Sequence, residues 1–183
     1  AAASSLLFLS SKILNDSLWH PVIKTKGHPF TSVSTIISFP ELNQAARGIG
    51  HITCDPDPDG MNRYFPLIFQ FKNGVIPSLT FKTVCDYLKV KPQNIEINFG
   101  SSIILKNAEI GVGLKKDIKI PIDQKGRLMI NYIGPWSDSF VIFPLHTLFE
   151  AYNDEALFFR FYNVMNGSMV VLSDISTRNK DYQ

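Results

Sequence analysis

The sequence has few cysteines, little net charge and no long apolar run. Its 183 residues include two cysteines, Cys54 and Cys85, which permit one disulfide without requiring it; two separate buried thiols are the favoured interpretation. The formal net charge is only +2, and the basic residues are scattered apart from the pair Lys115-Lys116. Binding of nucleic acid needs a concentrated basic surface and is therefore not expected. No segment approaches the ~20 apolar residues that cross a bilayer as a helix.

The sequence also lacks the common catalytic and metal-binding motifs. It contains no phosphate-binding loop, no G-x-S-x-G and no H-E-x-x-H, and the G-x-G runs at 48–50 and 111–113 are expected to be turns. His51 and Cys54, three residues apart in an expected strand, would point to opposite faces and form no catalytic pair. We predict no catalytic residue, no metal ligand and no cofactor. The remaining candidates are scattered: His20, His28, His146, Asp117, Asp123, Asp174 and Asp181.

The most distinctive stretch is an acidic turn between two apolar runs, Asp55-Pro56-Asp57-Pro58-Asp59-Gly60. The two prolines stiffen the backbone, and the closing glycine tolerates positive φ. Its spacing reproduces the first six positions of a calcium-binding EF-hand loop. The match fails at position twelve, where Pro66 replaces the bidentate glutamate. The alternative is a purely structural turn, in which carboxylates cap turn amides and one pairs with Arg63.

Apolar patterns and turn signals predict an α/β (α+β) fold, a mixed β-sheet with hairpins and packing helices, in a single domain over residues 1–183. Residues 15–40 are expected to form a long surface loop, because they contain three prolines and a glycine. Helices are predicted at 41–47, 78–88, 145–152 and 154–164. Strands are predicted at 5–13, 49–54, 62–71, 75–77, 94–98, 102–105, 118–122, 127–132, 140–143 and 168–172.

Several local signals fix the ends of these elements. Asn73-Gly74 predicts a hairpin, and Ser78 is placed to cap a helix whose apolar positions include Leu79, Val84, Tyr87 and Leu88. Pro144 is placed near the start of the third predicted helix.

In combination, these residues resemble the CHASE2 extracellular sensory domain. The likeness lies in Gly50-His51-Ile52, Pro56–Arg63, Pro77-Ser78-Leu79, and the runs Ile120–Gly126 and Arg127–Pro135. It covers about residues 45–181, so the chain is expected to be the C-terminal portion of such a domain, cut from a longer polypeptide.

The resemblance implies the sensory input domain of a bacterial transmembrane receptor, lying outside the cytoplasmic membrane. The output would be an adenylate or guanylate cyclase or a sensor kinase, with a nucleotide cyclase favoured, and the membrane segments would lie outside this chain. A small molecule or a protein is the implied signal, and homodimers are possible. The resemblance supplies no ligand-binding residues, so the ligand site is unknown.

We therefore expect structural roles for the residues of two segments. Asp57, Asp59, Gly60 and Arg63 would hold the acidic turn, and Asn131, Tyr132, Gly134 and Pro135 would hold an aromatic loop. The main alternative function is a free-standing periplasmic protein that binds a small molecule. A hydrolase built from the scattered Asp and His residues would require a nucleophile, a base and an oxyanion pocket to meet in space.

Overall fold

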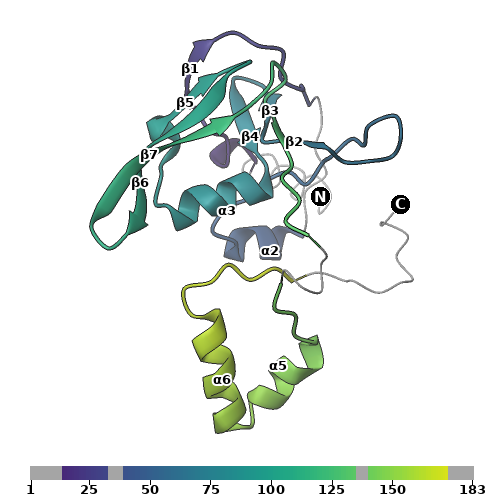
Figure 1. Ribbon diagram of the computed structural model, residues 1–183, viewed down its shortest axis with the longest axis vertical. Coiled ribbons are helices and arrows are strands. Elements are labelled where there is room, and N and C mark those ends of the chain that lie inside the picture. Colours follow the sequence, from purple (N-terminus) through teal and green to yellow (C-terminus); the bar gives the residue numbers. More distant parts are fainter. Residues whose placement is uncertain (1–13, 33–38, 135–139, 173–183) are drawn as a thin grey trace, which may run out of the picture. The chain divides into compact units, whose positions relative to one another are not determined.

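The computed structural model describes residues 14–32, 39–134 and 140–172 (Figure 1). The predicted strand at 5–13 and Pro135 lie outside these ranges. The chain divides into two compact units, Ala1–Ile130 and Asn131–Gln183, and each is described by itself. The single domain over residues 1–183 stays a prediction. Within the described ranges, no helix combines the length and apolar character that a membrane crossing requires.

The first unit is built on a four-stranded mixed sheet in the order β1-β5-β6-β7. Strand β1 runs parallel to β5, whereas β5, β6 and β7 form antiparallel pairs. This arrangement confirms the predicted mixed sheet with hairpins. Strands β6 and β7 extend beyond the predicted 102–105 and 118–122, because they continue as one hairpin. The bounds are β1 Val22–Thr25, β5 Ile95–Asn98, β6 Ser102–Gly111 and β7 Leu114–Pro121.

Helix α3 (Leu79–Tyr87) covers one face of this sheet (Figure 1). Successive side chains of a strand point to opposite faces, and buried residues alternate along β5 and in β6 from Ile103 to Leu105, with Ala108 following a register irregularity. They form one apolar cluster with Phe81 and Cys85 of α3. The buried strand residues of this cluster are Ile95, Ile97, Ile103, Leu105 and Ala108.

Helix α3 confirms the helix predicted at 78–88, but not every apolar position named for it is buried. Leu79 and Tyr87 are exposed, and the buried helix positions are Phe81 and Cys85, four residues apart. The predicted cap is confirmed, since the Ser78 hydroxyl accepts a hydrogen bond of 3.1 Å from the Phe81 amide. Ser78 is itself fully buried. It therefore fixes the first turn in an orientation that directs positions 81 and 85 toward the sheet.

The prediction of a long surface loop at 15–40 was wrong in part, and residues 33–38 of it lie outside the described ranges. Trp19 is buried and exchanges two backbone hydrogen bonds with Val75, of 2.9 and 3.0 Å, and β1 follows a few residues later. The prolines and the glycine bracket a short segment rich in β-branched residues, Val22–Thr25, instead of preventing one. The sequence did not show that the edge of β5 would be available for parallel pairing with Val22–Thr25.

Two short antiparallel ladders complete the first unit: β2 (Tyr64–Pro66) with β8 (Arg127–Met129), and β3 (Ile68–Phe71) with β4 (Gly74–Pro77). The strand predicted at 62–71 is therefore two strands with different partners, divided at Leu67. The predicted strand at 49–54 was wrong, because only His51 bridges to Ser78. The predicted hairpin is confirmed, with Lys72 and Asn73 as its two turn residues. Helix α2 spans Pro40–Ala45, and a 3₁₀ turn, η1, spans Pro92–Asn94.

The second unit contains helices α5 (Leu145–Ala151) and α6 (Glu155–Met165). Both confirm the predicted helices, and the Asp154 carboxylate caps α6 by accepting a hydrogen bond of 3.0 Å from the Leu157 amide. The predicted strands at 140–143 and 168–172 were wrong. These apolar runs have no strand partner within the described residues, and a strand forms only where a neighbouring backbone accepts and donates hydrogen bonds.

Candidate functional site

Arg63 closes the acidic turn by binding two of its aspartates. Its Nη1 and Nη2 atoms donate to the two carboxylate oxygens of Asp59 at 2.9 and 2.7 Å, and Nη1 also donates to Asp57 at 3.1 Å. Asp59 additionally accepts a hydrogen bond of 3.2 Å from the Met61 amide. The predicted pairing of one aspartate with Arg63 is thus present and extends to a second aspartate.

The backbone of the turn is closed by two hydrogen bonds. The Asp57 amide donates to the Met61 carbonyl at 2.9 Å, and the Gly60 amide donates to the Asp57 carbonyl at 2.8 Å. Gly60 has a φ of 81°, a left-handed conformation that glycine adopts without steric cost. The turn therefore combines a closed backbone with a fork of charged hydrogen bonds on its outer side.

The ion pair also sets the protonation of the turn. The side-chain hydrogen bond from Arg63, together with the Met61 amide, lowers the pKa of Asp59 to about 2. Both carboxylates in turn raise the pKa of Arg63. Asp59 and Arg63 therefore stay charged over the whole physiological pH range, and the guanidinium occupies the carboxylate oxygens that a cation would need. Within the described residues, no three His, Cys, Asp or Glu side chains gather as metal ligands.

A backbone ladder ties the acidic turn to the end of the first unit. Tyr64 pairs with Met129, and the Ile130 amide donates a hydrogen bond of 2.8 Å to the Arg63 carbonyl. The Arg127 guanidinium lies over the Tyr64 ring, 4.7 Å from its centroid, and its Nε atom donates to Asp123 at 2.7 Å. The residue that closes the turn is therefore joined to the last residue before the second unit.

His51 lies in an aromatic environment that the sequence motifs did not predict. Its ring lies 4.3 Å from the Phe69 ring, edge to face, and 6.2 Å from the Phe65 ring, and neither ring nitrogen has a hydrogen-bond partner. Burial lowers the pKa of His51 to about 4, so the imidazole is neutral at pH 7. The sequence signal for this site is Gly50, in the Gly-x-Gly run before His51. The backbone packs so closely there that a Cβ at Gly50 would lie 2.5 Å from the Leu79 backbone.

The two cysteines are free thiols, as favoured, but only Cys85 is buried. Burial raises the pKa of Cys85 to about 12. Cys54 is half-buried beside the acidic turn, and its Sγ atom lies 3.5 Å from Asn62 Oδ1 and 3.6 Å from the Tyr64 carbonyl oxygen. Desolvation, followed by the charges of Asp55 and Asp57, raises the pKa of Cys54. Neither thiol is activated as a nucleophile.

The scattered carboxylates do not assemble into a catalytic pair in the described part of the chain. Asp117 binds Lys106 at 2.9 Å, and Asp123 binds the side chain of Arg127 and the amides of its own turn. Asp174 and Asp181 lie outside the described residues. Asp117 and Asp123 are thus each engaged by a cation and backbone amides, and these contacts offer the hydrolase interpretation no support.

The aromatic loop belongs to the second unit. Asn131, Tyr132 and Gly134 are exposed, and Gly134 has a φ of 127°. Pro135 lies outside the described residues, so the predicted structural role of this loop stays a prediction.

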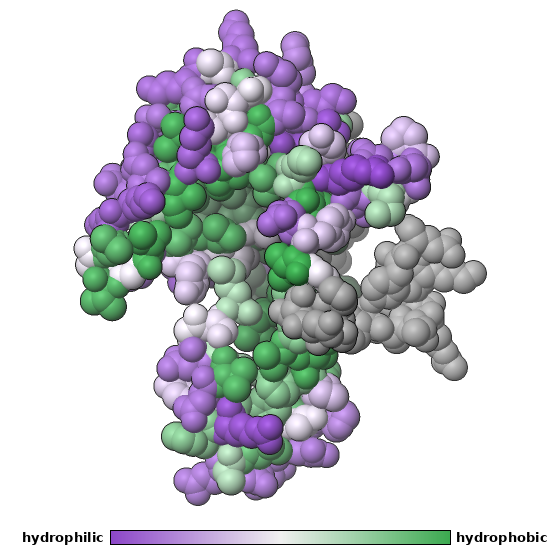
Figure 2. Space-filling model, viewed as in Figure 1, coloured by the Kyte–Doolittle hydropathy of each residue, from purple (hydrophilic) through white to green (hydrophobic). Residues whose placement is uncertain are grey.

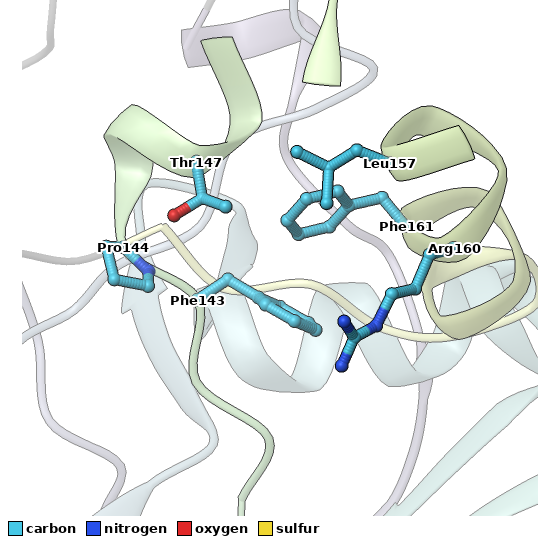
Figure 3. Close-up of a pocket in the computed structure, with 6 residues that line it drawn as sticks. All are labelled: Phe143, Pro144, Thr147, Leu157, Arg160 and Phe161. Carbon is cyan, nitrogen blue, oxygen red and sulfur yellow. The ribbon is translucent and has the colours of Figure 1, made fainter. Parts of the chain in front are cut away.

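The second unit has a small apolar hollow between α5 and α6 (Figure 3). Its volume is about 210 Å³. Phe143 and Phe161 meet edge to face with centroids 4.6 Å apart. Arg160 projects beside them and has no carboxylate partner in the described ranges. Sequence analysis predicted the helices but not this hollow. Its lining residues are Phe143, Pro144, Thr147, Leu157, Arg160 and Phe161.

The described residues thus form a mixed α+β fold with a charged turn closed by Arg63. The sequence model of the CHASE2 domain matches residues 7–182. The chain belongs to the CHASE2 family, whose members are sensory domains, typically extracellular. The match begins well before the start near residue 45 that the motifs indicated. No curated protein and no solved structure matches this chain significantly.

Proposed function

We propose that this chain is the extracytoplasmic input domain of a bacterial transmembrane receptor, and that the receptor's output domain is a nucleotide cyclase. The family membership of residues 7–182 carries this proposal. The domain itself performs no catalysis and uses no cofactor: it binds a signal and changes the activity of a domain across the membrane. Membrane segments outside this chain connect the two.

The mechanism is a shift between two arrangements of the domain. A signal that binds one arrangement more tightly raises its population, and only that difference in affinity can drive the output. The acidic turn, held by Arg63, and the β2–β8 ladder form one stiff element that reaches Ile130. Movement of this element would displace the start of the second unit, through which the chain continues toward its C-terminal end.

The signal is a small molecule or a protein. The hollow between α5 and α6 favours a small molecule with an apolar body, which Phe143 and Phe161 would contact. An anionic group on that molecule would pair with Arg160. A homodimer is part of the proposal, and the mass of the protein in solution tests it.

The location is tested with the complete gene product in a bacterial membrane. Alkaline phosphatase inserted after Gln183 folds into an active enzyme only outside the cytoplasm. We expect high phosphatase activity and no fluorescence from a cytoplasmic reporter placed at the same position. The reverse pattern would contradict the extracytoplasmic location.

The second candidate is a free-standing periplasmic protein that binds a small molecule, and the α5–α6 hollow is the observation that favours it. The gene downstream of the codon for Gln183 separates the two candidates. A segment of ~20 apolar residues followed by a cyclase domain supports the receptor. A stop codon close to Gln183, with no apolar segment upstream of the domain, supports the free-standing protein.

A further inference from the structure

The β6–β7 hairpin extends beyond the rest of its sheet. Strand β5 pairs with β6 only from Ser102 to Leu105, whereas β6 and β7 remain paired as far as Gly111 and Leu114 (Figure 1). The edge of β6 beyond β5 is covered in one place, where the Glu109 amide donates to the Leu88 carbonyl at 2.9 Å. Residues 110–114 therefore project past the last backbone contact with the body of the first unit.

The projecting end carries three exposed aliphatic side chains. Ile110 is 46% exposed, Val112 107% and Leu114 57%, and only the glycines at 111 and 113 separate them. Figure 2 shows this end of the hairpin as an apolar tip beyond a largely hydrophilic region. A two-residue hairpin turn is usually polar, because its side chains face water. Three clustered aliphatic residues at such a tip indicate a surface that becomes buried in a contact when the protein functions.

Behind the tip, positively charged side chains outnumber negatively charged ones. Lys89 pairs with Glu109 at 2.6 Å, and Lys106 pairs with Asp117 at 2.9 Å, so both nearby carboxylates are already neutralised. Lys115 and Lys116, directly after Leu114, are exposed and have no carboxylate partner among the described residues. Glu109 lies opposite Lys115 in the β6–β7 register, but its carboxylate is held by Lys89. The tip is therefore apolar at its end, and the lysines immediately behind it, Lys89, Lys106, Lys115 and Lys116, outnumber the carboxylates Glu109 and Asp117.

We propose that the β6–β7 tip, Ile110–Leu114, inserts into the interface of a phospholipid bilayer that carries anionic headgroups, with Lys115 and Lys116 binding the phosphates. Aliphatic side chains ahead of lysines match the order of acyl chains and charged headgroups in a membrane interface. A stable protein partner fits less well. Protein interfaces bury roughly 1,200–2,000 Å² with both partners counted, and three side chains at a narrow tip offer far less.

Vesicle binding by the 183-residue chain tests this proposal. Vesicles of phosphatidylcholine alone are compared with vesicles containing one third phosphatidylglycerol, and bound protein is measured by sedimentation. We expect binding to the anionic vesicles only. The double variant Ile110→Ser with Val112→Ser should bind at least about tenfold more weakly, because two aliphatic side chains no longer enter the interface.

Two further variants make the result specific. Lys115→Gln with Lys116→Gln should also lose about tenfold or more, since each lysine near an anionic surface contributes about a factor of five. Ile52→Ser changes an aliphatic residue that is 78% exposed in the segment before the acidic turn and should bind like the unmodified chain. All the changed side chains are exposed, so circular dichroism and melting temperature should not change.

Insertion itself is read from Val112→Trp, whose fluorescence should shift to the blue and be quenched by brominated lipids in anionic vesicles. Equal binding by the tip variants and the unmodified chain would overturn the proposal. So would the absence of binding to anionic vesicles, or a tip variant that changes only the mass of the protein in solution, which would assign the tip to a protein contact.

Discussion

The backbone amide of Ile130 donates a hydrogen bond of 2.8 Å to the carbonyl of Arg63, the residue whose side chain holds Asp57 and Asp59. The bond extends the β2–β8 ladder by one step, at the last residue of the first unit. A backbone hydrogen bond therefore joins the acidic turn directly to Ile130, in addition to the covalent chain between them. Residues 63 and 130 are distant in sequence, and only the ladder brings them together.

Replacement of Arg63 by alanine should lower the melting temperature slightly, because Asp57 and Asp59 then repel each other without a cation between them. The effect is small because the ion pair is exposed and screened by solvent. Arg63→Lys should recover part of the loss, since lysine supplies the charge but not the two-pronged geometry. Thermal melting measures both. Arg47→Ala is the matched control, because Arg47 is highly exposed and its ion pair with Asp86 is long, at 3.9 Å. A fall in melting temperature as large as that of Arg63→Ala would show that Arg63 does not specifically stabilise the acidic turn.

Stability should fall as pH drops from 6.5 toward 4. The folded pKa of His51 is about 4 and its unfolded value is 6.5, so between these values the unfolded state binds more protons. The stabilisation is complete above pH 6.5 and is lost progressively below it; the pKa difference sets an upper bound of about 3 kcal/mol, which solvent around the partly exposed ring reduces. Urea unfolding at pH 7.5, 5.5 and 4.5 measures the change.

His51→Phe is the control for this pH dependence. Phenylalanine retains an aromatic ring beside Phe65 and Phe69 but cannot take up a proton. The difference in unfolding free energy between pH 7.5 and 4.5 should shrink in this variant. Carboxylates with a lowered pKa, such as Asp59, also begin to lose their stabilising effect as the pH approaches their unfolded value of 3.8, but they do so in both chains, so the difference between the two pH profiles reports His51. An unchanged pH profile in His51→Phe would show that another group is responsible.

Loss of the cap on α3 should destabilise the protein by about 1–2 kcal/mol, because Ser78→Ala leaves the Phe81 amide without its acceptor in a buried position. Urea unfolding measures the loss. Thr80→Ala, at an exposed position of the same helix, should change the unfolding free energy by less than about 0.5 kcal/mol. Equal losses in the two variants would contradict a specific role of the Ser78 hydroxyl.

Calcium at about 1 mM should leave the melting temperature unchanged relative to chelator, because Arg63 already occupies the oxygens of Asp59 and contacts Asp57. A ligand that binds only the folded state must raise its stability. Differential scanning fluorimetry with and without chelator measures the shift. A rise of several degrees with calcium, and none with magnesium, would show that the turn is a calcium site.

Sequence reasoning succeeded where the signal was local. The hairpin signalled by Asn73-Gly74, the cap at Ser78 and the pairing of Arg63 with an aspartate of the acidic turn all depend on residues close in the chain. Such interactions are fixed by short-range geometry and hold wherever the segment lies in the fold.

Sequence reasoning failed where a strand forms only with a partner that is distant in the sequence. The chain changes partner at Leu67, from β8 to β4, and β1 forms because β5, far along the sequence, has a free edge. The apolar runs at 140–143 and 168–172 read as strands but have no such partner in the described ranges. The α5–α6 hollow was missed for a similar reason: Phe143 and Phe161 meet across two helices, and neither belongs to a motif.

In the proposed function, the acidic turn and its ladder carry a signal from this domain to a cyclase. The most direct test is the rate of cyclic-nucleotide formation by membranes that contain the complete gene product, with the unmodified chain or with Arg63→Ala. At equal amounts of protein in the membrane, we predict that the basal rate changes by about fivefold or more, in keeping with coupling energies of 1–3 kcal/mol. An identical rate in both membranes, or no cyclic nucleotide from either, would contradict the claim.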